Sequence, residues 1–156
     1  MSVLQRFIVD RHVFRVSAVD TATIPSVSRL AAARALAYAT NDLDLPSVVI
    51  RWFRAARPGE PVYFRRAGGV PEGVVNGERP MEIGIRADLP PVMVADVVLH
   101  EAMHVRQFLD GRDGYAPECQ REAEAYAESL VRAVLAKAIA AAAMRDAGRD
   151  AVSGPE

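Results

Sequence analysis

The chain has 156 residues, of which 51% are hydrophobic and 25% are charged. This length fits one domain with a buried core, so we predict a single domain over residues 1–150 and a disordered tail at 151–156. The net charge of -1 gives no general reason to expect a nucleic-acid or membrane partner, and the single cysteine, Cys119, excludes a disulfide framework. No targeting segment or membrane-spanning run is evident, so a cytoplasmic protein is the expectation.

The predicted elements begin with one or two short strands within residues 5–19, where β-branched and aromatic residues alternate with polar ones. Pro25 can occupy the first turn of a helix that runs to about Thr40. Strand-like runs follow at Ser47–Arg54 and at Pro61–Arg66.

The second half of the chain is predicted to be mainly helical. Residues 67–80 contain four glycines and two prolines, which indicates a loop or a hairpin tip, and Met81–Arg86 alternates as a further strand. Asp88 offers a cap for a helix over Val92–Leu109, and Pro117 begins a long helix that fades near Gly148. This order of a helix, a short and mostly antiparallel sheet and two further helices predicts an α+β domain.

The most informative feature is the sequence His100-Glu101-Ala102-Met103-His104, an HExxH motif. With three histidines and ten glutamates in the chain, the motif is expected by chance only about 0.004 times. Two histidines at positions i and i+4 of a helix lie about 40° apart, so their imidazoles can bind one metal ion. The motif also falls within a predicted helix, which is the context that the chemistry requires.

Neutral imidazole is a good ligand for Zn²⁺, which needs a third protein ligand and keeps a fourth position for water. Zinc lowers the pKa of that water toward neutrality. Glu101 lies about 100° around the helix from His100, where it can reach the water rather than the metal. It is therefore the predicted general base for attack on a carbonyl group.

At this point the chain resembles the gluzincin metallopeptidases, and most closely their small single-domain members, called minigluzincins. The resemblance covers roughly Met81–Leu130: a strand, the HExxH helix, a short loop and a second helix that bears glutamates. It implies a zincin-like fold, one Zn²⁺ ion, a peptide or protein substrate and a third zinc ligand that is a glutamate on the later helix.

Two glutamates compete for that third position. The family pattern of a glutamate, two residues and an alanine places the ligand at Glu122, with Ala125 as the small residue and Tyr126 where an aspartate is usual. Alternatively, Glu124 lies twenty residues after His104, as in the larger family members. The two glutamates are about 200° apart on a helix, so only one can face the zinc, and Glu122 is the first choice.

Three further residues are candidates for the site. Gln107 lies on the histidine face of its helix, where it can orient a ligand or touch the substrate, although a polar residue at the helix edge explains it equally well. Tyr115 and Tyr126 are candidate donors to the transition state, but each is more often a packing residue. The resemblance also implies that the strand Met81–Arg86 binds an extended peptide by strand addition, with residues 67–80 as a possible flap.

Arginines and aromatic residues are concentrated between residues 51 and 66, a combination that can form a nucleic-acid groove. They are Arg51, Arg54, Arg57, Arg65 and Arg66 together with Trp52, Phe53, Tyr63 and Phe64. Strands with a charged outer face produce the same pattern in an arginine-rich chain, so a nucleic-acid partner is not expected.

The leading hypothesis is a zinc metallopeptidase in which zinc is bound by His100, His104 and Glu122 or Glu124, with Glu101 as the general base. One alternative is a zinc-containing binding or regulatory module of the same fold with little or no catalysis. Another is a protease that acts on nucleic-acid-associated proteins.

Overall fold

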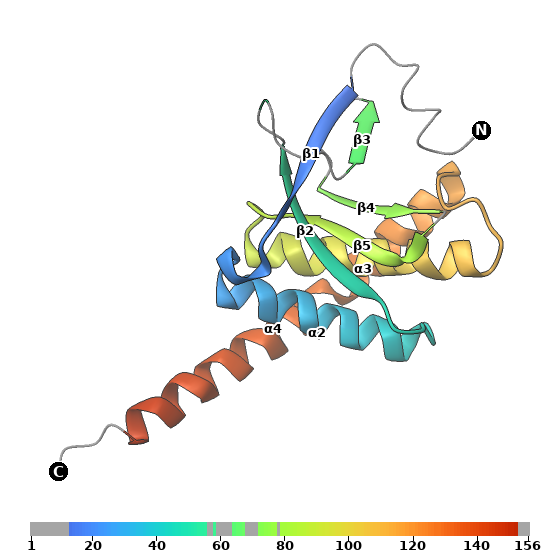
Figure 1. Ribbon diagram of the computed structural model, residues 1–156. Helices are drawn as coiled ribbons and strands as arrows, with labels where there is room; N and C mark the ends of the chain where they lie inside the picture. The colour runs from blue at the N-terminus through green and yellow to red at the C-terminus, as the bar shows by residue number, and fades with distance from the viewer. Residues whose placement is uncertain (1–12, 56–57, 59–63, 68–71, 78, 153–156) are drawn as a thin grey trace.

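A computed structural model describes residues 13–55, 58, 64–67, 72–77 and 79–152, which form a five-stranded mixed sheet and three α-helices (Figure 1). In chain order the elements are β1 (Val13–Val19), the 3-10 helix η1 (Thr21–Thr23), α2 (Ser26–Asp42), β2 (Val49–Ala55), β3 (Phe64–Ala67), β4 (Gly73–Asn76), β5 (Arg79–Arg86), α3 (Pro91–Leu109) and α4 (Pro117–Val152). The predicted α+β class is confirmed for these residues.

The strands are ordered β3-β1-β2-β5-β4 across the sheet. Every neighbouring pair is antiparallel except β2 and β5, which run parallel with Ile50 opposite Ile83. The sheet is therefore mostly antiparallel, as predicted, with one parallel exception in its interior. This order places β5 between two strands and leaves β4 at an edge.

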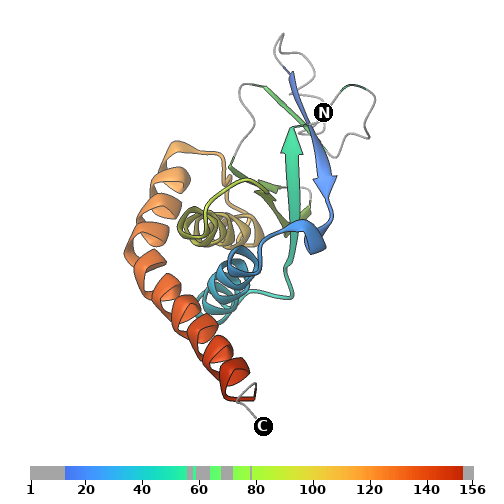
Figure 2. The same cartoon turned by 90° about the vertical axis from the view of Figure 1, so that its left-hand side faces the viewer.

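Helix α3 lies at the centre of the molecule. Figure 2 shows it nearly end-on, between the sheet and α4, with α2 beside it. Its buried residues lie on all sides of the helix: Val94, Ala95, Val97, Val98, Leu99, Glu101, Ala102, Met103, His104, Val105 and Gln107. A helix that is buried all round is held by packing on every face, so the side chains that it carries are firmly positioned.

Small residues allow α2 to pack closely in this layer. Ala31, Ala35 and Ala39 recur every four residues on one face and are fully buried. The end of α2 is also tied to α3, because the Arg106 guanidinium donates hydrogen bonds to the carbonyl oxygens of Leu43 and Asp44. The helix predicted from Pro25 to about Thr40 is thus confirmed.

The start of α3 differs from the prediction in one respect. Pro90 is the N-cap residue and makes no side-chain capping bond, while Pro91 is the first helical residue. Asp88, the predicted cap, instead accepts a hydrogen bond from Arg86 Nε at 2.6 Å. The proline's fixed φ starts this helix without a capping carboxylate.

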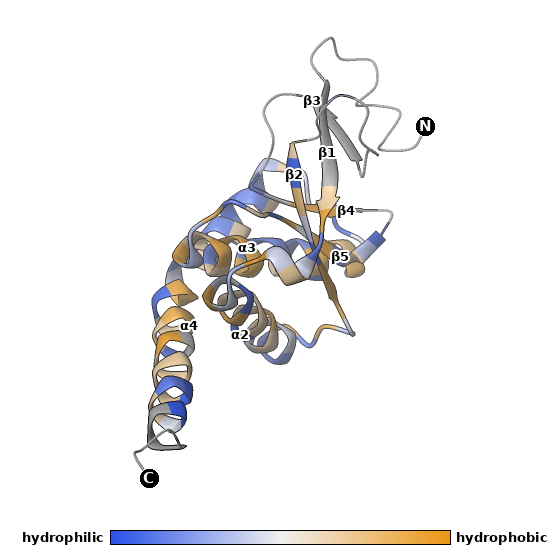
Figure 3. Cartoon of the chain, turned by 60° about the vertical axis from the view of Figure 1, so that its left-hand side comes forward, coloured by the Kyte–Doolittle hydropathy of each residue, from blue (hydrophilic) through white to orange (hydrophobic). Residues whose placement is uncertain are grey.

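Helix α4 is 36 residues long, and its second half extends away from the rest of the molecule (Figures 1 and 3). Its first half packs against α2 and α3, where Cys119, Ala123 and Ala127 are buried. The helix continues to Val152, so the tail predicted to be disordered begins with helix. Residues 153–156 of that tail lie outside the described residues.

The glycine-rich segment 67–80 is not only a loop, because residues Gly73–Asn76 form the edge strand β4. Residues 68–71 and 78 of this segment lie outside the described residues, as do residues 5–12 and 61–63 of the predicted strands. Gly73 is needed for the close approach of β4 to α3: a Cβ atom here would overlap Val97 Cγ1 and lie 3.0 Å from Glu101 Oε1.

Replacement of Gly73 by alanine is therefore expected to destabilise the protein by about 1–3 kcal/mol, as overpacking of a well-filled site does. The matched control is Gly148→Ala in α4, where an added Cβ meets no atom within 4 Å. That change is expected to be neutral or to stabilise the helix by up to about 1 kcal/mol. Urea unfolding of both variants measures the two effects, and equal stabilities would contradict the close approach.

Candidate metal centre

The two histidines of the HExxH motif point their Nε2 atoms at the same place. The Nε2 atoms of His100 and His104 are 3.0 Å apart, and the rings meet edge to face with their centroids 4.8 Å apart. Two nitrogens that bind one tetrahedral zinc ion at about 2.0–2.1 Å are separated by about 3.3 Å. The pair is therefore arranged as two ligands of one metal ion would be.

A third polar atom joins this arrangement from α4. Gln120 Oε1 lies 3.1 Å from His104 Nε2, and the Gln120 side chain also forms a hydrogen bond with His100. Among the described residues, no three side chains of His, Cys, Asp and Glu gather closely enough to hold a metal ion. A metal ion held by both histidines would therefore need its third protein ligand from a residue close to Gln120.

Helices α3 and α4 are matched residue by residue along this contact. His104 contacts Gln120. One turn away, the charge of Glu124 acts on His100, and a further turn away the charge of Glu128 acts on Asp96. Each helix contributes a residue every four positions, which is one turn of an α-helix. The two stripes therefore face each other, and Glu124 lies in the stripe opposite the histidines.

Burial and neighbouring charges shift the pKa values of His100 and Asp96 in opposite directions. Burial lowers the pKa of His100, and the neighbouring His104 lowers it further, while Gln120, Asp96 and Glu124 act in the opposite direction. Burial raises the pKa of Asp96, which His100 partly offsets. A lowered pKa keeps the His100 imidazole neutral at pH 7, which is the form that binds zinc.

The first-choice ligand, Glu122, lies elsewhere. Its Oε2 atom is 2.8 Å from an Arg112 guanidinium nitrogen and accepts a hydrogen bond from Gln107 Nε2 at 3.3 Å. The hydrogen bond from Arg112 lowers the pKa of this carboxyl group. Since Glu122 lies about 200° around α4 from both Gln120 and Glu124, the side-chain placement favours Glu124 over Glu122.

Glu101 projects to a different side of α3, about 100° around the helix from His100. It is 8% exposed, and its Oε1 atom lies against the backbone of β4 at Gly73. The side chains of the motif thus divide between two neighbours: His104 faces α4 and Glu101 faces the edge strand. The roles predicted from the sequence, in which the glutamate contacts the water and not the metal, stay predictions.

The strand that precedes the HExxH helix is not at an edge of the sheet. β5 contains the predicted substrate strand Met81–Arg86, but β2 pairs with one side of it and β4 with the other. A peptide cannot add to β5, so that prediction is wrong. Among the described strands, the sheet edge next to β5 is β4, whose Gly73–Asn76 segment was expected to be part of a loop.

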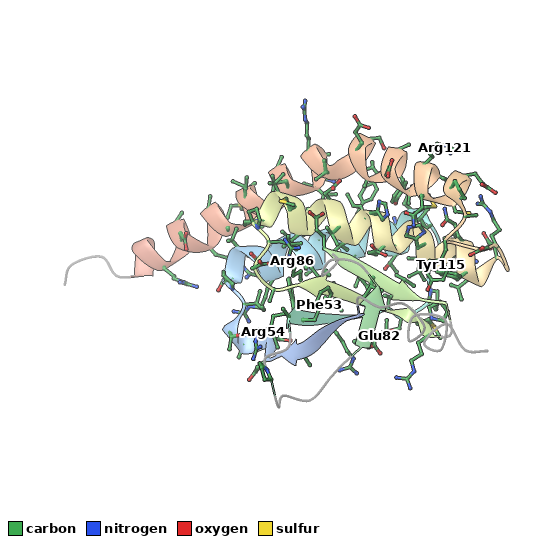
Figure 4. The ribbon with its side chains drawn as sticks, turned by 90° about the horizontal axis from the view of Figure 1, so that it is seen from above. Phe53, Arg54, Glu82, Arg86, Tyr115 and Arg121 are labelled. Atoms are coloured by element: carbon green, nitrogen blue, oxygen red, sulfur yellow. The ribbon has the colours of Figure 1, made fainter. Side chains whose placement is uncertain are left out.

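Neither tyrosine proposed as a transition-state donor has its hydroxyl group bonded to the histidines. Tyr115 OH donates to Val75 O at 3.1 Å and accepts from Gly77 N at 3.3 Å, which ties the α3–α4 loop to β4 (Figure 4). Tyr126 OH donates to Asp42 Oδ2 at 3.0 Å, and burial raises its pKa. Both tyrosines therefore hold elements together.

The region of arginines and aromatic residues between positions 51 and 66 is partly neutralised within the sheet. Arg51 forms an ion pair with Glu82 at 2.9 Å on the neighbouring strand, and Arg54 donates to Ala55 O. Phe53 is fully buried and Trp52 nearly so, which makes them core residues rather than stacking platforms. Arg57 and Tyr63 lie outside the described residues.

Sequence reasoning missed Gln120, Arg112 and β4. The spacing of Gln120, Glu124 and Glu128 at four-residue intervals repeats that of Asp96, His100 and His104, and this signal is present in the sequence. No comparable local signal exists for Arg112, because its contact with Glu122 depends on how the loop between the helices turns.

Comparison with known proteins gives no relative for this arrangement: no family model, no curated protein and no solved structure matches the chain. Within the described residues, no helix combines the length and apolar character needed to cross a membrane.

Proposed function

We propose that this protein is a zinc-dependent hydrolase of peptide bonds, of the gluzincin type that its motif resembles. The observation that supports this most strongly is the convergence of His100 Nε2 and His104 Nε2, 3.0 Å apart, on a central buried helix. Zinc, when bound, polarises the substrate carbonyl and lowers the pKa of water. The remaining steps depend on groups that the chain itself provides.

The residues that would hold the metal are His100, His104 and Glu124. The histidines fit zinc because both nitrogens point to one place and burial lowers the pKa of His100. Glu124 is the third ligand in this proposal because it lies one turn beyond Gln120, on the face that contacts the histidines. Its exposed position leaves its side chain room to change rotamer.

Glu101 would act as the general base. Its carboxylate takes a proton from the attacking water and then delivers it to the amine nitrogen that leaves when the peptide bond breaks. The buried position next to Gly73 holds the carboxylate in place and shields it from bulk solvent. A base positioned beside the site in this way typically contributes about 10²–10⁴-fold to the rate.

The substrate would bind to β4 as an added strand. Arg86 N donates to Glu72 O, so alternate residues from Glu72 face β5 and the residues between them face outward. Tyr115 OH already bonds to Val75 O and Gly77 N, which agrees with this alternation, so a peptide would pair with β4 at Gly73. Gly73 is then the outward-facing residue next to Glu101, and a peptide paired with it lies beside the base.

Metal analysis tests this proposal directly. Wild-type protein purified without added zinc is expected to contain one zinc per chain, and His100→Ala is expected to lose it. His12→Ala, the same change at the chain's remaining histidine, is the control and should keep the metal. Hydrolysis of a quenched fluorescent peptide mixture is then measured on the same samples.

The outcomes separate the candidate functions. Zinc together with zinc-dependent cleavage supports a peptidase. Zinc without cleavage of any peptide in the mixture would support the binding or regulatory module instead. Wild-type protein that fails to bind zinc would contradict the proposed function.

A further inference from the structure

The Gln107 side chain is fully buried in α3, and its orientation is determined by its neighbours. Its Nε2 atom donates hydrogen bonds to the backbone oxygen of Cys119 at 3.0 Å and to Glu122 Oε2 at 3.3 Å. A carbonyl oxygen and a carboxylate oxygen can only accept hydrogen bonds, so the amide nitrogen must face both of them. The amide oxygen of Gln107 therefore faces the other way, toward His104.

This orientation determines the tautomer of His104. Gln107 Oε1 lies 2.7 Å from His104 Nδ1, and an amide oxygen can only accept a hydrogen bond. Nδ1 must then carry the proton and donate it. In the neutral ring the lone pair is left on Nε2, which then accepts from His100 Nε2–H. Gln120 Oε1, an acceptor 3.1 Å from His104 Nε2, is bonded by His100 and receives no hydrogen bond from His104.

Arg112 keeps Glu122 in the position that this arrangement needs. It lies 2.8 Å from Glu122 Oε2, and this charge-assisted hydrogen bond favours the ionised carboxylate. An ionised carboxylate has no proton to donate, so it can only accept from Gln107 Nε2. This excludes the reversed amide orientation, in which Gln107 would offer a donor to His104.

The turn at the end of α3 places Arg112 above Gln107. Gly111 has a φ of 77°, its N–H donates to Phe108 O, and Arg112 N donates to Gln107 O at 2.9 Å. This pair of bonds is the Schellman motif, which favours glycine at the residue with positive φ. The backbone of Arg112 is thus fixed to the same residue that its side chain supports through Glu122.

We propose that Gln107, Glu122 and Arg112 form a hydrogen-bonded brace that fixes His104 in its Nδ1–H tautomer and so positions Nε2 to bind the metal. The proposal rests on the metal site described under Proposed function. It makes Glu122 a positioning residue instead of a ligand. Partners of this kind typically contribute about 10–100-fold to metal affinity.

The tautomer can be measured in metal-free protein, independently of any activity. Long-range ¹H–¹⁵N spectra at about pH 8, where histidine is neutral, distinguish Nδ1–H from Nε2–H rings, and the chain has only three histidines to assign. We expect His104 to be the Nδ1–H tautomer in the wild type. Gln107→Leu should shift it toward the Nε2–H form and weaken zinc binding by about 10–100-fold in a chelator competition assay.

Arg112→Ala is the second variant, because a leucine in place of buried Gln107 can impair folding. Arg112 lies on the surface, and its loss is expected to weaken zinc binding in the same direction while leaving the fold intact. Arg121→Ala, at an exposed arginine on α4 (Figure 4), is the control and should leave zinc affinity unchanged.

Two results would overturn the brace. One is an Nε2–H tautomer of His104 in the metal-free wild type. The other is wild-type zinc affinity in a folded Arg112→Ala variant whose His104 tautomer is also unchanged. Zinc binding by the wild-type protein is measured separately from both results. If the wild type binds zinc, either result contradicts the brace alone; if it does not bind zinc, the proposed function is contradicted.

Discussion

Replacement of Glu101 by glutamine is expected to reduce peptide hydrolysis by about 10²–10⁴-fold while zinc stays bound. Glutamine has nearly the shape of glutamate, so the packing against Gly73 is kept, but an amide cannot take a proton from water at neutral pH. The measurement is kcat on a cleaved peptide, together with the zinc content of the same preparation.

The control for this variant is Glu118→Gln, which makes the same change at an exposed glutamate in the first turn of α4. It should retain full activity. Wild-type turnover in Glu101→Gln would show that the buried carboxylate is not the base. Loss of zinc in the same variant would instead place Glu101 among the ligands.

Among the carboxylates of α4, Glu124 has the largest expected effect on metal affinity. Glu124→Gln removes the proposed carboxylate ligand, so zinc affinity should fall by more than about 100-fold, beyond the range typical of residues that only orient a ligand. Glu122→Gln disturbs the ion pair with Arg112, and its effect should stay within about 10–100-fold. Chelator competition measures both variants on one scale.

Equal losses in these two variants would contradict the division of roles between ligand and brace. Gln120→Ala completes the comparison, because Gln120 Oε1 lies 3.1 Å from His104 Nε2. We expect that variant to keep zinc. If it lost zinc while Glu124→Gln kept it, the amide and not the carboxylate would be the third ligand.

The helices could be located from the sequence because their signals are local. Pro91 begins α3, Gly111 follows its end and Pro117 begins α4, each close to where propensity places it. The HExxH motif requires only a helix to bring its histidines together, so the contact between His100 and His104 follows from spacing alone.

The choice between the two glutamates could not be made from the sequence. It depends on how α4 is rotated and shifted against α3, which is set by a turn and by packing between distant residues. The same is true of the sheet edge. The strand that pairs with β5 is set by contacts between residues far apart in the sequence. β4 has only four residues, with glycine and asparagine at its ends, so its two valines are too few to mark it as a strand.

The residue-by-residue match between α3 and α4 has a consequence for the first turns of α4. Adding one residue inside the helix, between Pro117 and Gln120, would turn every later side chain by about 100° relative to the start of the helix. An added residue in the surface loop between Asp110 and Ala116 can be absorbed there, but one inside α4 would move Glu124 off the histidine face. The number of residues from Pro117 to Glu124 is therefore constrained by the proposed metal site, and not only by the need to continue the helix.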